Sequence, residues 1–110
     1  MAKGIYYVES RPASPEVDAE FNRWYNNVHL PEMIALEGIV SVRRFAPVTD
    51  DGPYVAIYEL EGDDLPTILK GMMVAARPGA LTLSDLQQMD PPPTMRLLEV
   101  TTEYPAPGGH

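Results

Sequence analysis

His29 is the side chain in this sequence that is best suited to moving protons. An imidazole titrates near neutral pH, so it can accept and then donate a proton within one reaction cycle. The chain has two histidines, and because His110 is the last residue, His29 is the internal one. The alternative is a structural role, in which the ring caps the C-terminal end of a helix and complements the helix dipole.

Tyr25 and Glu32 lie close to His29 along the chain and are candidates to assist it. Residues four apart share one face of a helix, so the Tyr25 hydroxyl is placed to position a substrate oxygen beside the imidazole. Packing as an amphipathic aromatic is an equal alternative for Tyr25. Glu32, which follows Pro31, is a candidate acceptor that orients His29, and the alternative is a solvated turn residue.

Four further side chains, on predicted strands, are candidates for binding a substrate. Arg43 and Arg44 are neighbours, so they point to opposite faces, and the one that faces the pocket could clamp a carboxylate or an enolate oxygen. The alternative for the arginines is a salt bridge at a sheet edge. Tyr7 and Tyr58, like Tyr6 and Tyr54 on the same strands, combine an apolar ring with a hydroxyl, which suits a phenolic or lactone ligand, and core packing is their alternative.

A helix over residues 15–28 is predicted to carry Tyr25 and to end at His29. Ser14 and the proline after it are typical of a helix start, with the serine as N-cap and the proline at the first helical position. Apolar residues then recur at intervals of four, three and four, which places them on one stripe facing the core. Tyr25 and His29 are expected on the flank of that stripe. Pro31 should end the helix.

The remaining elements follow from alternating β-branched and aromatic residues, from helical periodicity and from turn residues. Met72 and Met73 are interpreted as helix packing. Residues 80–93 are predicted to be irregular, with one helical turn near 84–89, and 105–110 to be a flexible tail. The other predictions are a strand over 3–9, a short turn over 32–36, a hairpin of strands over 38–45 and 54–61, a helix over 65–76, and a strand over 95–104.

The order strand, helix, strand, strand, helix, strand predicts an α+β fold of the ferredoxin-like βαββαβ type. Right-handed crossovers place both helices on one face of a four-stranded antiparallel sheet, within a single domain over residues 1–104. Apolar residues alternate on both sides of the predicted strands, so the other face should be too apolar to remain in water. We therefore expect a homodimer in which two sheets form a barrel, with a small-molecule pocket between each sheet and its helices.

The composition excludes several classes of protein. There is no cysteine, so disulfides, thiolate nucleophiles and cysteine-bound metals are ruled out. The net charge of −8 disfavours nucleic acid and anionic membranes as partners, and no apolar run approaches the roughly 20 residues of a membrane span. No phosphate-binding loop, nucleotide motif or metal-ligand cluster is present, so no cofactor and no metal are predicted. No secretory signal is evident at the start of the sequence, and a cytoplasmic protein is expected.

A first strand is followed by a helix carrying Phe21, Trp24 and the tract Val28-His29-Leu30-Pro31, and then by Gly38-Ile39-Val40-Ser41 and Arg44-Phe45. This arrangement resembles the dimeric α/β-barrel superfamily, and within it the EthD-like group. The resemblance implies a homodimer in which His29 closes the first helix and points toward the ligand pocket. Members of this superfamily include cofactor-independent isomerases, polyketide cyclases, dehydratases, small monooxygenases and proteins of unknown role.

Two functions of different classes are consistent with these residues. The first is a small cofactor-independent enzyme of the isomerase, cyclase or dehydratase type, in which His29 transfers a proton on a small cyclic or aromatic metabolite. The second is a non-catalytic accessory protein that binds a small molecule in the same barrel. Better-equipped members of the resembling superfamily place a second histidine on a strand across the pocket, and the second function explains why the predicted strands here contain none. A cofactor-free monooxygenase is a further alternative.

Overall fold

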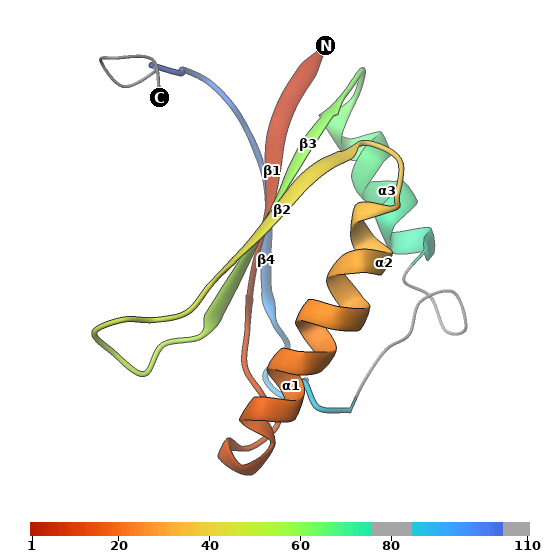
Figure 1. Ribbon diagram of the computed structural model, residues 1–110. Helices are drawn as coiled ribbons and strands as arrows, with labels where there is room; N and C mark the ends of the chain where they lie inside the picture. Colours follow the sequence, from red (N-terminus) through yellow and green to blue (C-terminus); the bar gives the residue numbers. More distant parts are fainter. Residues whose placement is uncertain (76–84, 105–110) are drawn as a thin grey trace.

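The protein has one four-stranded antiparallel sheet with its helices packed against one face, as Figure 1 shows. The structure, a computed structural model, describes residues 1–75 and 85–104. The strands are β1 (Ala2–Ser10), β2 (Ile39–Phe45), β3 (Tyr54–Gly62) and β4 (Thr94–Glu99), in the spatial order β2-β3-β1-β4. This order and the α+β composition confirm the predicted ferredoxin-like fold.

The sheet is built around β1 and β3, which pair along their whole length. Tyr6 of β1 lies opposite Tyr58 of β3 and Leu97 of β4, and β2 and β3 form the predicted hairpin. The prediction that the last strand continues to residue 104 is wrong, because β4 ends at Glu99. Its partner β1 starts at Ala2, so after one more backbone bond, from Val100 N–H to the carbonyl of residue 3 (2.9 Å), no strand remains to pair with.

The first helical segment runs further than predicted and passes through Pro31. It consists of a 3₁₀ turn η1 (Pro15–Val17), α1 (Asp18–Trp24), a π-helical turn η2 (Tyr25–His29) and α2 (Leu30–Ile34). In η2 the N–H of the residue before Pro31 bonds the carbonyl of Tyr25, five positions back. A proline has no N–H to donate, and in a regular helix its ring crowds the carbonyl four positions back. Here that carbonyl belongs to the π-turn, which is wider than a regular helical turn and leaves room for the ring. The helix therefore continues instead of ending.

The second helix completes the helical layer, and residues 85–89 pair with the segment after β1. Helix α3 (Leu65–Ala75) packs on the same sheet face as α1 and α2. The helical turn predicted near residues 84–89 is wrong for 85–89, which instead form an antiparallel bridge between Gln87 and Pro12. The predictions for residues 76–84 and for the tail 105–110 lie outside the described residues.

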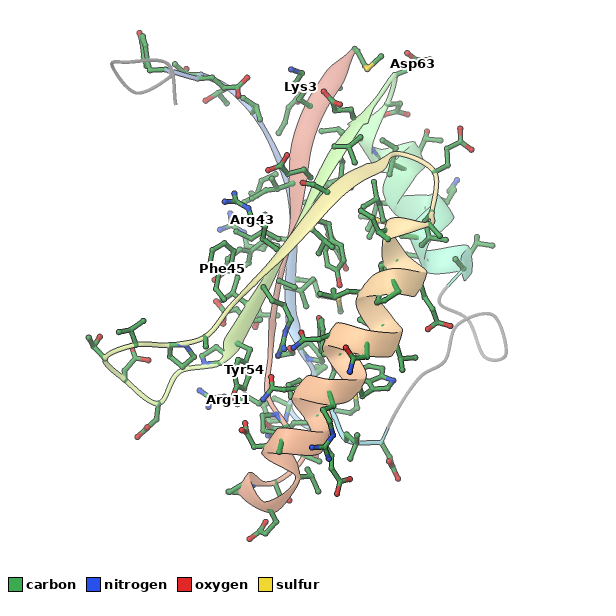
Figure 2. All side chains as sticks on the ribbon, viewed as in Figure 1. Lys3, Arg11, Arg43, Phe45, Tyr54 and Asp63 are labelled. Atoms are coloured by element: carbon green, nitrogen blue, oxygen red, sulfur yellow. The ribbon has the colours of Figure 1, made fainter. Side chains whose placement is uncertain are left out.

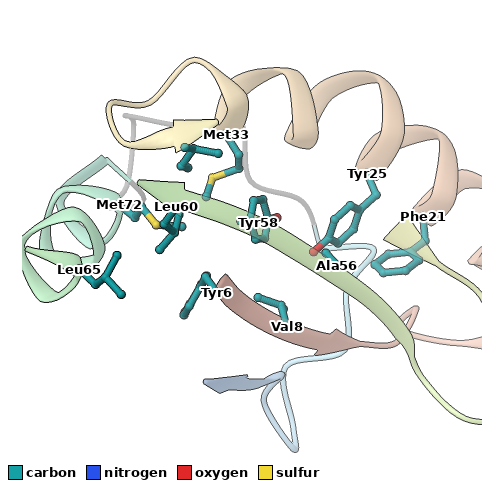
Figure 3. Packing of buried hydrophobic residues seen from close by; sticks show 11 residues of the cluster. Tyr6, Val8, Phe21, Tyr25, Met33, Ala56, Tyr58, Leu60, Leu65 and Met72 are labelled. Atoms are coloured by element: carbon teal, nitrogen blue, oxygen red, sulfur yellow. The ribbon is translucent and has the colours of Figure 1, made fainter. Parts of the chain in front are cut away.

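The core lies between the sheet and the helices, as Figure 3 shows. Side chains alternate along each strand, so every second residue of β1 and β3 is buried against the helical layer. Tyr25, expected on the flank of the helix, is instead only 1% exposed and belongs to the core. The main members of this cluster are Tyr6, Val8, Phe21, Tyr25, Met33, Ala56, Tyr58, Leu60, Leu65 and Met72.

The opposite face of the sheet carries no helix among the described residues. Ile5, Tyr7 and Ile57 lie there and are half-buried, while Phe45 is 42% exposed. Figure 2 shows Arg43 and Phe45 projecting from the sheet away from the helices. The helices of residues 1–75 and 85–104 include none that is long and apolar enough to cross a membrane.

Candidate functional site

A cavity of about 220 Å³ lies between the helical layer and the sheet, and His29 forms part of its wall. Six segments far apart in the sequence contribute to it: β1, η2, α2, β3, α3 and residues 87–95. None of the described residues that line it is an Asp, Glu, Lys or Arg. The cavity is therefore a mostly apolar space whose polar groups include one imidazole and three tyrosine hydroxyls, those of Tyr6, Tyr25 and Tyr58.

His29 is held between aromatic rings at the end of the π-turn. Its ring stacks on Trp24, with centroids 5.0 Å apart and planes 20° apart, and lies nearly perpendicular to the ring of Tyr25, with centroids 4.9 Å apart. Burial lowers the pKa of His29 below its ordinary value of 6.5; Glu32 raises it in part, and Arg44 lowers it further. The imidazole is thus neutral at neutral pH, and its buried Nδ1 has no hydrogen-bond partner among the described residues.

Tyr25 and Tyr58 both line the cavity and lie close together in the core (Figure 3), and each is 1% exposed. Burial first, and then the neighbouring Tyr25, raise the pKa of Tyr58 far above its ordinary value. Tyr6 lies beside them, with its ring 6.1 Å from that of Tyr58, and its hydroxyl donates to the Sδ of Met95 at 2.8 Å. Burial also raises the pKa of Tyr6, so the hydroxyls of Tyr6 and Tyr58 remain protonated.

Methionine side chains form much of the remaining wall. The chain has six methionines, and all except Met1 line this cavity: Met33, Met72, Met73, Met89 and Met95. The prediction that Met72 and Met73 serve helix packing is confirmed for Met72, which is 1% exposed, but Met73 is 48% exposed. Because thioether chains are flexible and contact aromatic rings favourably, such a wall can adapt to flat ligands.

Sequence reasoning missed most of this wall. The five methionines are spread over α2, α3, the segment before β4 and β4 itself, and no local pattern connects them. The signal that could have found Met33 is its spacing of four from His29, which is one helical turn. The others become neighbours only once the sheet order is known.

The structure brings together three of the seven predicted site residues, His29, Tyr25 and Tyr58. Tyr7 and Arg43 point to the opposite face of the sheet, away from this cavity. There the Tyr7 hydroxyl donates to the Glu9 carboxylate at 2.8 Å, and Arg43 forms an ion pair of 3.8 Å with Glu59. Neither residue lines the cavity of this chain.

Arg44 and Glu32 lie near the cavity without lining it. The Arg44 guanidinium lies 4.3 Å from the centre of the Tyr25 ring and is not among the residues that line the cavity, so the prediction that it clamps a carboxylate there is wrong. Glu32 is half-buried in α2 and close enough to influence the pKa of His29, but it does not bond to Nδ1.

Metal ligands do not gather at this site. Within residues 1–75 and 85–104, no group of three or more His, Cys, Asp or Glu side chains is placed to hold a metal ion. The polar groups described here are suited to hydrogen bonding and proton transfer.

Comparison with known proteins adds no name to this geometry. The chain matches no protein-family model, no curated protein and no solved structure. The resemblance to the dimeric α/β-barrel superfamily therefore stays a prediction. A shared fold would not select one activity in any case, so function has to be argued from the site.

Proposed function

We propose that the protein is a small cofactor-independent enzyme that transfers a proton on a small, uncharged, cyclic or aromatic metabolite, with His29 as the proton carrier. The observation that carries the proposal is the position of His29: a neutral imidazole in the wall of an apolar cavity. A general base must be unprotonated at the working pH, and burial keeps His29 in that form.

The chemistry needs only groups that the cavity offers. His29 removes a proton from a carbon next to a carbonyl, and the electron pair of that C–H bond moves to the carbonyl oxygen as an enolate. A tyrosine hydroxyl stabilises this oxygen by donating a hydrogen bond. Return of the proton to another carbon gives an isomerase; loss of a hydroxyl group, which takes the proton from His29 and leaves as water, gives a dehydratase.

The lining supports an uncharged substrate. An ionised ligand would lose its hydration in a cavity where no described side chain carries an opposite charge, and this loss is costly. Arg44, the described cation whose charge bears on His29, contacts the ring of Tyr25 and does not line the cavity. The volume of about 220 Å³ exceeds the roughly 150 Å³ that accommodates benzene in an engineered protein cavity, so an aromatic ring with substituents fits.

A binding protein without catalysis is the second candidate. The observation that favours it is the predominance of methionine, tyrosine and proline in the wall, which would hold an apolar metabolite whether or not it reacts. A single general acid–base contributes about 10²- to 10⁴-fold in rate, so catalysis with one histidine needs a reactive substrate. A cofactor-free monooxygenase, in which the substrate anion itself reacts with oxygen, is a further candidate on the same site.

We also propose that the protein works as a homodimer joined through the helix-free face of the sheet. Apolar side chains from three strands lie on this face, among them Ile5, Ile57 and Leu98. Exposed apolar surfaces of this kind are typical of protein interfaces, and a two-fold pairing of the same face on each copy would cover both.

Proton transfer can be tested before the natural substrate is known. The protein is incubated in D₂O with a panel of cyclic ketones, lactones and phenols, and exchange of carbon-bound hydrogen is followed by NMR. We expect the wild-type protein to accelerate exchange for some members, and His29→Gln to lose about 100-fold or more of this acceleration. The matched control is His110→Gln, which removes the other imidazole and should leave the rate unchanged.

Two results would decide against the enzyme proposal. If His29→Gln folds normally and exchanges as fast as the wild type, His29 is not the proton carrier. If members of the panel bind stoichiometrically, seen as chemical-shift changes around the cavity, but none exchanges or is converted during long incubation, the protein is a binding protein.

A further inference from the structure

Arg44 lies inside a cage of three aromatic rings between β2 and the first helix. Its guanidinium carbon is 4.3 Å from the ring centre of Tyr25, 4.8 Å from that of Tyr54 and 5.5 Å from that of Phe21. A cation within about 6 Å of a ring face is attracted by the electron density of that face. Arg44 therefore interacts with all three rings at once.

The guanidinium has few conventional partners. One nitrogen, Nη1, donates to the Oδ1 of Asn26 at 3.1 Å, while Nε and Nη2 are buried without hydrogen-bond partners among the described residues. Leaving buried N–H groups unsatisfied is unfavourable, and the ion pairs of the described residues do not include Arg44. An arginine held this way contributes mainly through the rings that it contacts.

One side of the cage is fixed by its own hydrogen bonds. The Tyr54 hydroxyl donates to the Asp18 carboxylate at 2.7 Å and accepts from the side-chain amide of Asn22 at 3.1 Å. Because Tyr54 cannot shift easily, Arg44 is held between a fixed ring and the ring of Tyr25. The contact thus restrains Tyr25, while Arg44 itself does not line the cavity.

We propose that Arg44 is a positioning residue, which holds the ring of Tyr25 against the cavity and so fixes how Tyr25 meets His29. This inference rests on the proposed function, since it assigns a role in the site of His29. Tyr25 connects Arg44 to His29. Its ring is in contact with the Arg44 guanidinium, and the planes of the Tyr25 and His29 rings are 78° apart. Arg44 acts through this ring and does not touch the substrate.

The charge of Arg44 has a second effect on the same site. The described groups whose charge bears on the pKa of His29 are Glu32 on α2, which raises it, and Arg44 on β2, which lowers it. Removing the positive charge should favour the protonated imidazole. The titration of His29 therefore reports on Arg44 without any substrate.

The test compares Arg44→Met, Arg44→Lys and Arg43→Met by NMR titration of the imidazole signals, in a His110→Gln background that leaves His29 as the single histidine. Arg44→Met should raise the pKa of His29 and change the imidazole chemical shifts, because the Tyr25 ring is released. Arg44→Lys keeps the charge but not the planar stacking group, so it should change the chemical shifts with a smaller effect on the pKa. Arg43→Met, on the opposite face, should change neither.

Asn26→Ala covers the case in which the Arg44 variants do not fold. Asn26 is exposed and anchors Nη1, so its removal should shift the His29 titration in the same direction by a smaller amount. Unchanged His29 titration and chemical shifts in a folded Arg44→Met or, failing that, in Asn26→Ala would overturn the inference. The NMR titration needs no turnover. The role of Arg44 can therefore be disproved while the proposed function stands, and the proposed function can be disproved while the role of Arg44 stands.

Discussion

At the scale of single residues, the properties of His29 come from its surroundings more than from its type. The sequence was sufficient to select His29 as the internal histidine at the end of a helix. It was not sufficient to predict that burial keeps the ring neutral. The contacts that bury the ring, with Trp24 and Tyr25, depend on the geometry of the π-turn. Nor could it separate Arg43 from Arg44, since alternation predicts opposite faces without saying which residue faces the helices.

The lowered pKa of His29 predicts how stability depends on pH. Between its lowered folded-state value and 6.5, the unfolded chain binds more protons than the folded protein, so stability rises with pH. The contribution of His29 is complete above about pH 6.5 and is lost as the pH falls to the folded value. Each unit by which the pKa is lowered corresponds to about 1.4 kcal/mol.

Urea unfolding of the wild type and of His29→Gln at a series of pH values measures this contribution. The free energy of unfolding of the wild type should fall more steeply than that of the variant as the pH drops below about 6.5. Parallel curves for the two proteins would mean that the imidazole is not buried in its neutral form.

At the scale of the elements, the boundaries that were predicted wrongly are those set by contacts between segments. Strand patterns and turn residues were enough to place β1, β2 and β3 to within one residue. The end of β4 depends on where β1 begins, and the passage of the helix through Pro31 depends on the π-turn before it. Neither is visible in the local pattern of apolar residues.

Two glycines give a sharp test of how these elements pack. Gly38, between α2 and β2, has a positive φ of 90°, and a Cβ there would lie 2.8 Å from the Ile68 side chain of α3. Gly38→Ala should therefore destabilise the protein by about 2–4 kcal/mol, from backbone strain and overpacking together. Gly71→Ala, in α3 where nothing lies within 4 Å of the added carbon, should stabilise it by about 1 kcal/mol.

Chemical unfolding of both variants beside the wild type measures the two effects. The opposite signs make the pair informative, because the same chemical change is made at both sites. A Gly38→Ala protein as stable as the wild type would show that α3 does not pack on the junction between α2 and β2.

At the scale of the whole molecule, most of the fold prediction followed from the order of the helices and strands. Strand and helix periodicities were enough to predict the βαββαβ order, and right-handed crossovers then placed the helices on one face. The cavity could be predicted only in outline, because its wall combines residues from Tyr6 to Met95 that become neighbours after folding. Its methionines in particular carry no periodic signal.

The proposed dimer gives the whole-molecule prediction. In sedimentation or light scattering, the wild type should have twice the chain mass of 12.2 kDa. Ile57→Lys places a charge at the centre of the helix-free face, opposite Tyr7 and Arg43 in the sheet register, and should give a monomer. The control is Ile34→Lys, on α2 and already 40% exposed, which should remain a dimer. A monomeric wild-type protein at micromolar concentration would contradict the proposal.

The π-turn at Tyr25–His29 has a consequence for length variation along this helix. A π-turn contains one residue more than a regular helical turn. Inserting a single residue into an α-helix would produce the same geometry. In a related chain one residue shorter at this point, the helix would be regular and everything after it would be rotated by about 100°. Met33 would then leave the space above the sheet while the architecture stayed intact. A one-residue change in length is thus a simple route by which proteins of this shape can exchange one ligand for another.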